Sequence, residues 1–478
     1  MKRLNGMDAM LLYSETPNLP MHTLKAAVVS TADFDGDFSY ESFRRTLQRR
    51  MHLLDPLRYR LVDIPWRLHH PMWLENCDVD LDYHVRRVQV GPPGGRRELD
   101  EIIAQIMATP LDRTRPLWEF HFAEGMADGR FAVIGKFHHA LADGVAAVNL
   151  LARAMDLVGS ADERDDYPRD PMPSDAQLLK EAARDHAQQI AGLPGLVHEA
   201  VTGFTRVRRH DRTRGEQPTM AKVFNAPPTF LNHVVSPVRT FASAALPLTD
   251  VKATAKALGV TINDMVLAIS TGAMRELLLR YDGHADEPIV ASVPISTNRS
   301  ADRISGNEIG GLPVSLPVHV ADPLERLRLT ALSASNAKED NEIRGAELIP
   351  RAMDYLPSAL APPALRWLSQ RDAHNKMMNV PVSNVPGPRE RGHFGGAPVT
   401  EIYSTGVLSP GVGINITVWS YVEQMDISIL ADDRTFTDVH EVTDAMVDAF
   451  VELRLAAGLP AELTPLSSAM PPAHAIID

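Results

Sequence analysis

The chain has 478 residues and a formal net charge of −13. Hydrophobic residues make up 44% of it and charged residues 23%, which excludes a disordered or low-complexity chain because enough apolar surface is present to offset the entropy cost of folding. The negative charge argues against a general nucleic-acid-binding protein, which would normally be basic. The length predicts two or three domains, each large enough for its own core.

Cys77 is the only cysteine, so no intrachain disulfide framework is available, and this fits a reducing compartment. The N-terminal residues lack the apolar segment of a secretory signal peptide. No run of residues approaches the roughly 18 apolar positions of a membrane span. We therefore expect a cytoplasmic protein that is soluble or, at most, peripheral to a membrane.

The first part of the chain alternates between strand and helix patterns. Apolar alternation predicts strands at 24–30 and 131–137. Apolar residues at helical spacing predict helices at 40–53, 98–107 and 145–157. These elements form a first half that we place at residues 1–158.

A linker and helical connection is predicted at 159–227. Residues 159–175 are rich in Asp, Ser and Pro, which is typical of a surface linker, and 178–207 have a helical pattern with a break at 192–194. A basic cluster follows: Arg206, Arg208, Arg209, Arg212 and Arg214. This cluster is either a solvated loop or a contact with a phosphate group or an anionic lipid surface.

A second half is predicted at 228–478. Its helices are expected at 248–258, 263–279 and 438–455, and its strands at 289–294, 413–420 and 425–430. Thr261 is a plausible N-cap for the second helix. The mixture of strands and helices in both parts predicts an α/β (α+β) fold with two halves of similar size.

The pattern that carries chemistry is His138-His139, three further residues, and Asp143-Gly144. It follows a predicted strand and precedes a predicted helix. Adjacent strand residues point to opposite faces, so the two histidines are not expected to share one role. Asp143 can fix the backbone or pair with an arginine, and Gly144 allows a tight turn and leaves room beside an imidazole.

Three interpretations of this motif compete. The first is a metal site made of His138, His139 and Asp143, which the opposed directions of the histidines disfavour. The second is a structural pair of histidines. The third is a general base, because a histidine near its natural pKa can accept a proton from a hydroxyl or thiol that attacks a carbonyl. The strand-to-loop position and the following Asp-Gly favour the third.

Further blocks accompany the motif along almost the whole chain. They lie at 4–8 with Met21 and His22, 116–119, 229–232 with Arg239, 263–268, 306–307, 383–388 and 420–421. Together with the HHxxxDG motif they resemble the bacterial wax ester synthase/diacylglycerol acyltransferase family, which is part of the acyltransferase superfamily of chloramphenicol acetyltransferase and peptide-synthetase condensation domains. Asn5-Gly6 and Met265 depart from the usual family residues, without touching the histidines.

The resemblance implies two chloramphenicol acetyltransferase-like halves packed around a central substrate channel. It implies transfer of an acyl group from acyl-CoA to diacylglycerol, which would give the protein a part in triacylglycerol and glycerol metabolism, or to a long-chain alcohol, which would give a wax ester. His139 would be the general base, and His138, Asp143 and Gly144 would support the motif. Neither a metal nor a bound cofactor is expected, since CoA is a substrate carrier.

Other residues have less certain roles. Asn263 is either an oxyanion or acceptor contact or a residue that satisfies the start of a helix. Pro116, Leu117 and Trp118 are expected to pack near the acyl tunnel or between strands. We expect 383–388 to be a loop that crosses between the halves.

Two other functions stay open at this point. One is a condensation-type acyltransferase that uses carrier-protein thioesters, and the other is a noncatalytic lipid-binding homologue. Lipid substrates would bring the protein to the surface of the inner membrane or of a lipid droplet, and the basic cluster is the best candidate for that contact.

Overall fold

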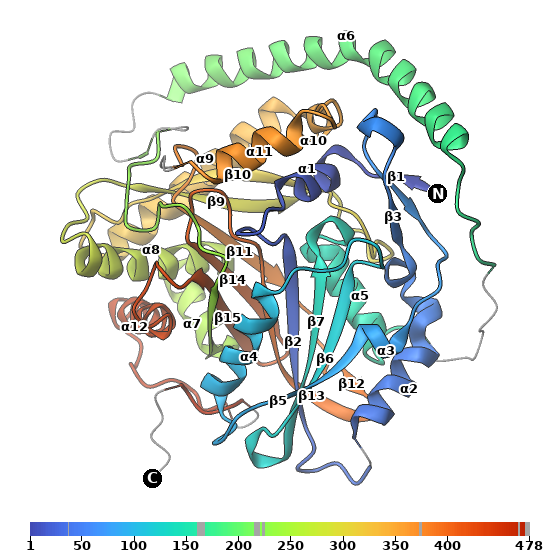
Figure 1. Ribbon diagram of the computed structural model, residues 1–478. Helices are drawn as coiled ribbons and strands as arrows, with labels where there is room; N and C mark the ends of the chain where they lie inside the picture. Colours follow the sequence, from blue (N-terminus) through green and yellow to red (C-terminus); the bar gives the residue numbers. More distant parts are fainter. Residues whose placement is uncertain are drawn as a thin grey trace.

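The computed structural model describes residues 1–36, 38–159, 168–214, 220–221, 225–371, 375–466 and 469–473. Two six-stranded sheets lie side by side at the centre, and helices cover their outer faces (Figure 1). A small third sheet holds β1 (Lys2–Arg3), β4 (Met72–Leu74) and β3 (Arg60–Val62).

The first sheet holds the strand that leads into the histidine motif. Its strands, in spatial order, are β12 (His393–Phe394), β13 (Ala397–Thr405), β2 (His22–Ser30), β7 (Arg130–His138), β6 (Trp118–Glu124) and β5 (Val85–Gln89). Neighbours are antiparallel except β5 and β6. The predicted strands at 24–30 and 131–137 are confirmed as β2 and β7, and their register sets His22 opposite His138.

Helices cover both faces of this sheet. They are α1 (Gly6–Ser14), α2 (Tyr40–Arg50), α3 (Leu81–His84), α4 (Arg96–Ala108) and α5 (Gly144–Ala154). The helices predicted at 40–53, 98–107 and 145–157 are thus confirmed, and the first continues as a 3-10 turn, η1 (Met51–Leu53). Phe43 and Leu47 of α2 pack with Leu150 and Leu151 of α5 in one apolar core against the sheet.

The second sheet belongs to the second half of the chain. Its strands, in spatial order, are β10 (Ile309–Leu316), β9 (Ile289–Ser296), β11 (Val380–Pro386), β14 (Ile414–Tyr421), β15 (Gln424–Asp432) and β8 (Arg239–Pro247). β11 runs parallel to both of its neighbours. The expectation of a loop at 383–388 is therefore wrong for its first four residues, because they pair with β14 as a central strand.

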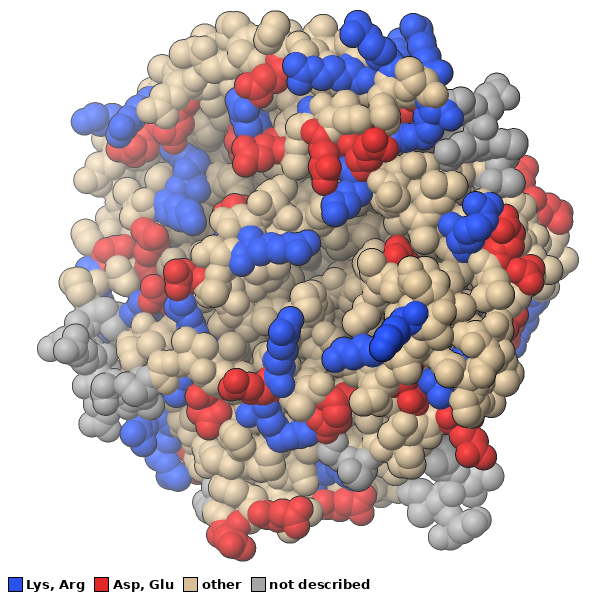
Figure 2. All heavy atoms as spheres, turned by 180° about the vertical axis from the view of Figure 1, so that it is seen from behind, with Lys and Arg blue, Asp and Glu red and all other residues tan. Residues whose placement is uncertain are grey.

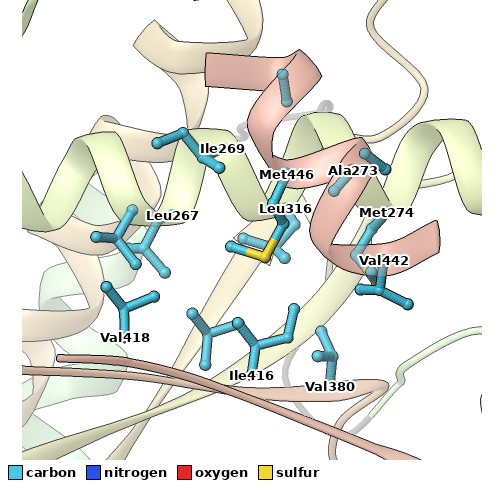
Figure 3. Close-up of a cluster of buried hydrophobic side chains, with 14 of the residues drawn as sticks. Leu267, Ile269, Ala273, Met274, Leu316, Val380, Ile416, Val418, Val442 and Met446 are labelled. Atoms are coloured by element: carbon cyan, nitrogen blue, oxygen red, sulfur yellow. The ribbon is translucent and has the colours of Figure 1, made fainter. Parts of the chain in front are cut away.

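The helices of the second half are α7 (Leu248–Leu258), α8 (Ile262–Tyr281), α9 (Pro323–Arg344), α10 (Leu348–Met353), α11 (Ala361–Ser369) and α12 (His440–Ala456). Thr261 is the N-cap of α8, as the sequence predicts, and it forms a capping box with Asp264. Figure 3 shows Leu267 and Met274 of α8 and Met446 of α12 facing Ile416 of β14. This packing fixes α8 on the sheet that carries β11.

The two halves are interlocked because the second half contributes two strands to the first sheet. β12 and β13 come from the second half of the chain, yet β13 pairs with β2 at the edge of the first sheet, with Val399 opposite Val29 and Thr405 opposite Leu24. The half boundaries at 158 and 228 stay a prediction. Within the predicted linker, residues 160–167, 215–219 and 222–224 lie outside the described residues.

The connection between the halves is helical over most of its described length. α6 (Asp175–Arg214) is one 40-residue helix that curves over the outside of the molecule (Figure 1). The predicted break at 192–194 is wrong, because Pro194 lies inside the helix. A proline there removes one hydrogen bond and bends the helix axis. Buried Leu178 and Leu196 hold the segments before and after it in place. The basic cluster at 206–214 is the end of this helix and not a loop.

Within the described residues, no single helix has the length and apolar composition of a membrane span. The α7–α8 pair meets those two criteria only when taken together, with a bend of 96° between its helices.

Candidate active site

The histidine motif lies where β7 ends. The 3-10 turn η5 (His139–Leu141) follows the strand, and α5 begins at Gly144. The backbone N–H of His138 donates to the Leu117 carbonyl at 2.9 Å, and that of His139 donates to the Met21 carbonyl at 2.8 Å. The predicted strand–loop–helix context is confirmed, and both histidines are anchored to neighbouring strands or their extensions.

The two histidines have different environments. His138 is completely buried, and its Nδ1 accepts a hydrogen bond from the backbone N–H of Ala140 at 3.1 Å. Burial lowers the pKa of His138 well below its usual value. His139 is only partly buried. The side chain of His139 therefore keeps some exposure, whereas His138 is buried and holds the turn.

The surroundings of His139 keep its imidazole neutral. Burial is the main cause that lowers the pKa of His139, and the charge of Lys25 lowers it further, whereas the carboxylate of Asp143 acts in the opposite direction. The net result is a pKa below the usual value of a histidine. At neutral pH the ring carries no charge and can accept a proton, which is what a general base requires.

Asp143 fixes the loop rather than handling protons. Its Oδ1 accepts from the backbone N–H of Ala146 at 3.0 Å and so caps α5. The same oxygen is 2.8 Å from the Arg303 guanidinium, in an ion pair with both side chains buried. Oδ2 accepts from the backbone N–H of Glu308 at 3.0 Å. Asp143 thus ties the motif of the first half to the β9–β10 connection of the second.

Asn307 makes a second tie between the halves. Its Nδ2 donates to the His139 carbonyl at 2.7 Å and to Asp8 Oδ1 at 2.8 Å. Gly306 donates its backbone N–H to the Leu141 carbonyl at 2.7 Å. The block at 4–8, the motif and the block at 306–307, which are distant in sequence, therefore meet at one point.

The roles of Arg303 and Asn307 are not predicted from the sequence. Arg303 stands in a polar stretch without a pattern that would mark it. Asn307 was recognised only as part of a resembling block, and that block was the available signal.

Gly144 lies at a close contact between the two halves. A Cβ at this position would be 3.2 Å from Cγ2 of Val385 on β11, which is tighter than ordinary side-chain contact. Glycine therefore permits β11 to pass close to the start of α5.

The other predicted site residues lie at different depths. Pro116, Leu117 and Trp118 are buried, and Trp118 donates its indole N–H to the Leu57 carbonyl at 2.7 Å while pairing with Phe137 across the sheet. They support the motif strand from the neighbouring strand β6 and the residues before it, and their contact with substrate stays a prediction. Asn263 is half-buried on α8, where its Oδ1 accepts from Asn384 of β11 at 3.5 Å, rather than from any described residue of the motif.

The motif does not have the arrangement of a metal site. Nδ1 of His138 is engaged by a backbone N–H, and Asp143 is engaged by Arg303. In the part of the chain that the structure describes, no group of three or more His, Cys, Asp or Glu side chains is placed to hold a metal ion.

Comparisons with known proteins agree with this geometry. Family models match over residues 4–266, described as the wax ester synthase/diacylglycerol acyltransferase catalytic domain, and over residues 305–454, described as the C-terminal domain of the same family. A Mycobacterium tuberculosis H37Rv protein that bears the name of a diacylglycerol O-acyltransferase is 53% identical over 470 residues, covering 98% of this chain and 99% of that protein.

Solved structures extend the comparison to the fold. The wax ester synthase/diacylglycerol acyltransferase from Marinobacter aquaeolei VT8 matches with a TM-score of 0.65 and 27% identity, covering 96% of this chain and all of that one. The first condensation domain of the CDA synthetase shares the fold alone, with a TM-score of 0.58 and 16% identity over 98% and 99% of the two chains. The predicted α/β fold of two chloramphenicol acetyltransferase-like halves is confirmed. The chain belongs to the wax ester synthase/diacylglycerol acyltransferase family and is an acyltransferase.

Proposed function

We propose that the protein transfers a long-chain acyl group from acyl-CoA to diacylglycerol, to a long-chain alcohol or to both, with His139 as the general base. The observation that carries this proposal is a neutral, partly exposed histidine on a loop fixed by Asp143, Arg303 and Asn307. His139 takes the hydroxyl proton of the acceptor while the oxygen attacks the thioester carbon. Collapse of the tetrahedral intermediate breaks the C–S bond, and His139 returns the proton to the CoA sulfur. No metal or bound cofactor takes part.

The test supplies purified protein with labelled palmitoyl-CoA and either dioleoylglycerol or hexadecanol. We expect labelled triacylglycerol, wax ester or both, together with free CoA. Lipid binding without an ester product would favour a noncatalytic homologue. Product formed only from a palmitoylated carrier protein would favour condensation-type chemistry.

We propose further that the protein works in the cytoplasm at the surface of the inner membrane or of a lipid droplet, which it contacts through α6. Five apolar side chains at helical spacing form what we call the α6 row: Ile190, Leu193, Val197, Val201 and Phe204, all between 44% and 73% exposed. An exposed apolar row beside a polar face is typical of helices that lie in a lipid interface. Glu199, the single acidic residue in this stretch, points away from the row and pairs with Arg351 at 2.6 Å.

The basic cluster continues this surface, but only four of its five arginines are available for contact with lipid. Arg214 pairs with Glu339 at 2.8 Å and Asp340 at 2.9 Å on α9, so its charge is neutralised within the protein. The remaining members are exposed, and two of them, Arg208 and Arg212, follow Phe204 at four-residue intervals and so extend the α6 row. Figure 2 shows Lys and Arg side chains gathered at this end of α6.

Vesicle binding tests this surface. Serine at Val197, Val201 and Phe204 should weaken binding to neutral and to anionic vesicles, because apolar burial does not depend on lipid charge. Glutamine at the four exposed arginines should weaken binding to anionic vesicles alone, by up to about 1 kcal/mol for each arginine near the surface.

Glutamine at Arg45 and Arg49, which are exposed on α2, removes charge elsewhere and serves as the control. Equal binding of all three variants in flotation assays would refute the α6 contact.

A further inference from the structure

The first sheet contains two buried lysines with contrasting environments. Lys136 on β7 lies 3.0 Å from the Glu119 carboxylate and also donates to the Thr109 carbonyl at 3.0 Å. Lys25 on β2 is 5% exposed, and its one hydrogen bond within the described residues is a long contact of 3.4 Å with the Leu24 carbonyl. No carboxylate of the described residues pairs with Lys25. Burial of an unpaired ammonium costs several kcal/mol, so Lys25 requires an explanation that Lys136 does not.

Lys25 lines an apolar pocket that borders the histidine motif. The pocket lies between the first sheet and α5. It is narrow, with a volume of about 20 Å³. Its lining includes Thr23, Phe120, Phe137, Leu150 and Leu151, and Lys25 is its single titratable member. Trp419 of β14 lies beside the ammonium, with its ring centre 5.5 Å from Nζ. An aromatic face can hold a cation, but it supplies no hydrogen-bond acceptor.

This pocket adjoins the candidate base. Leu141 and Ala142, which follow His139 in the motif loop, form part of its lining. The charge of Lys25 is one of the causes that lower the pKa of His139. The pocket therefore combines an apolar wall with one charged hydrogen-bond donor, next to the loop that carries His139.

We propose that Lys25 donates a hydrogen bond to the carbonyl oxygen of the acyl thioester and stabilises the oxyanion of the tetrahedral intermediate. This inference rests on the proposed acyl transfer. When the acceptor oxygen bonds to the thioester carbon, the carbonyl π pair moves onto its oxygen, beside the ammonium. The pair returns as the C–S bond breaks, and the thiolate leaves with the proton from His139. Lys25 keeps its own proton throughout.

Replacement of Lys25 by methionine tests the role of the charge. Loss of one oxyanion donor lowers kcat by roughly 10²- to 10³-fold. Because the variant also removes an unpaired buried charge, its melting temperature should be equal to or above that of the wild type. A more stable but slower enzyme separates this role from a merely structural one. Lys252→Met, at an exposed position on α7, is the matched control and should leave kcat unchanged.

The pH profile and Lys25→Arg supply an independent readout. Burial lowers the pKa of Lys25 to about 7, so the charged form, and with it kcat, should decline as the pH rises through 7. His139, whose pKa the charge of Lys25 lowers, becomes neutral at lower pH, so it does not cause this decline. Arginine stays charged over this range, so Lys25→Arg should retain activity and move the alkaline limb upward.

Infrared spectroscopy of carbon-13-labelled palmitoyl-CoA, bound without an acceptor alcohol, detects the contact even in an enzyme that does not turn over. We expect the carbonyl stretch to shift to lower frequency in the wild type and in Lys252→Met, and to return toward its free value in Lys25→Met. The same carbonyl stretch in the wild type and Lys25→Met would overturn the assignment. If the shift is lost in Lys25→Met but the wild type forms no ester, the contact stands and the proposed acyl transfer fails.

Discussion

Replacement of His139 by alanine should lower kcat for palmitoyl transfer by about 10²- to 10⁴-fold, which is the range that a general base contributes. His139 is the partly exposed histidine of the motif, and its lowered pKa keeps it neutral and able to accept a proton. Its imidazole is not the group that holds the loop, because the ties to Met21 and Asn307 use the backbone of His139. The variant should therefore remain folded.

Steady-state kinetics over a pH series measure this effect. Because the pKa of His139 is lowered from the usual value of a histidine, the fall of wild-type kcat on acidification should come at a lower pH than for an ordinary histidine, when the ring becomes protonated. The residual activity of His139→Ala should lack this acidic limb. His284→Ala, at an exposed loop position, controls for loss of a histidine as such. Turnover of His139→Ala within threefold of this control would exclude His139 as the base.

Replacement of Arg303 by alanine should destabilise the protein by about 3–5 kcal/mol. The guanidinium of Arg303 is the countercharge of buried Asp143, and it also donates to the carbonyls of Gly306 and Asn298 at 3.0 and 3.1 Å. Its removal leaves a carboxylate buried without a positive partner. Because Asp143 caps α5 and fixes the motif loop, kcat should fall as well.

Urea denaturation measures the change in the free energy of unfolding. Arg299→Ala, four positions earlier and exposed, should have little effect and is the matched control. Combining Arg303→Met with Asp143→Asn removes both charges. The double variant should therefore lose less stability than the sum of the losses measured for the single variants Arg303→Met and Asp143→Asn. Strict additivity of the two would show that the pair is not coupled.

Elements with strong local signals could be predicted from the sequence. β7, the motif loop and α5 form a continuous segment in which alternation, a turn and helical periodicity follow one another, and Thr261 marks the start of α8 by its capping box. The sequence predicts a break in α6 at Pro194, where the structure has a continuous helix. A proline weakens a helix locally, but whether the helix breaks or only bends depends on tertiary contacts.

Partners separated by long stretches of chain could not be predicted. Asp143 was expected to fix the backbone or to pair with an arginine, but nothing in its surroundings points to Arg303 rather than to any of the other arginines. Lys25 lies in an ordinary strand pattern, and its isolation from carboxylates depends on the packing of α5 and β14. Asn263 was weighed as an oxyanion contact by its residue type alone, and the structure gives it Asn384 as a partner.

The insertion of β13 into the first sheet has a consequence for synthesis of the protein. β2 lies within the first 30 residues, whereas β13, which covers its outer edge, ends at Thr405. At 5 to 20 residues per second, the ribosome needs about 20 to 75 seconds to deliver that partner. During this interval the backbone edge of β2, a strand with apolar side chains, is open to pairing with other nascent chains. The protein should therefore depend on chaperones until translation is nearly complete, and fragments that stop before residue 397 should aggregate.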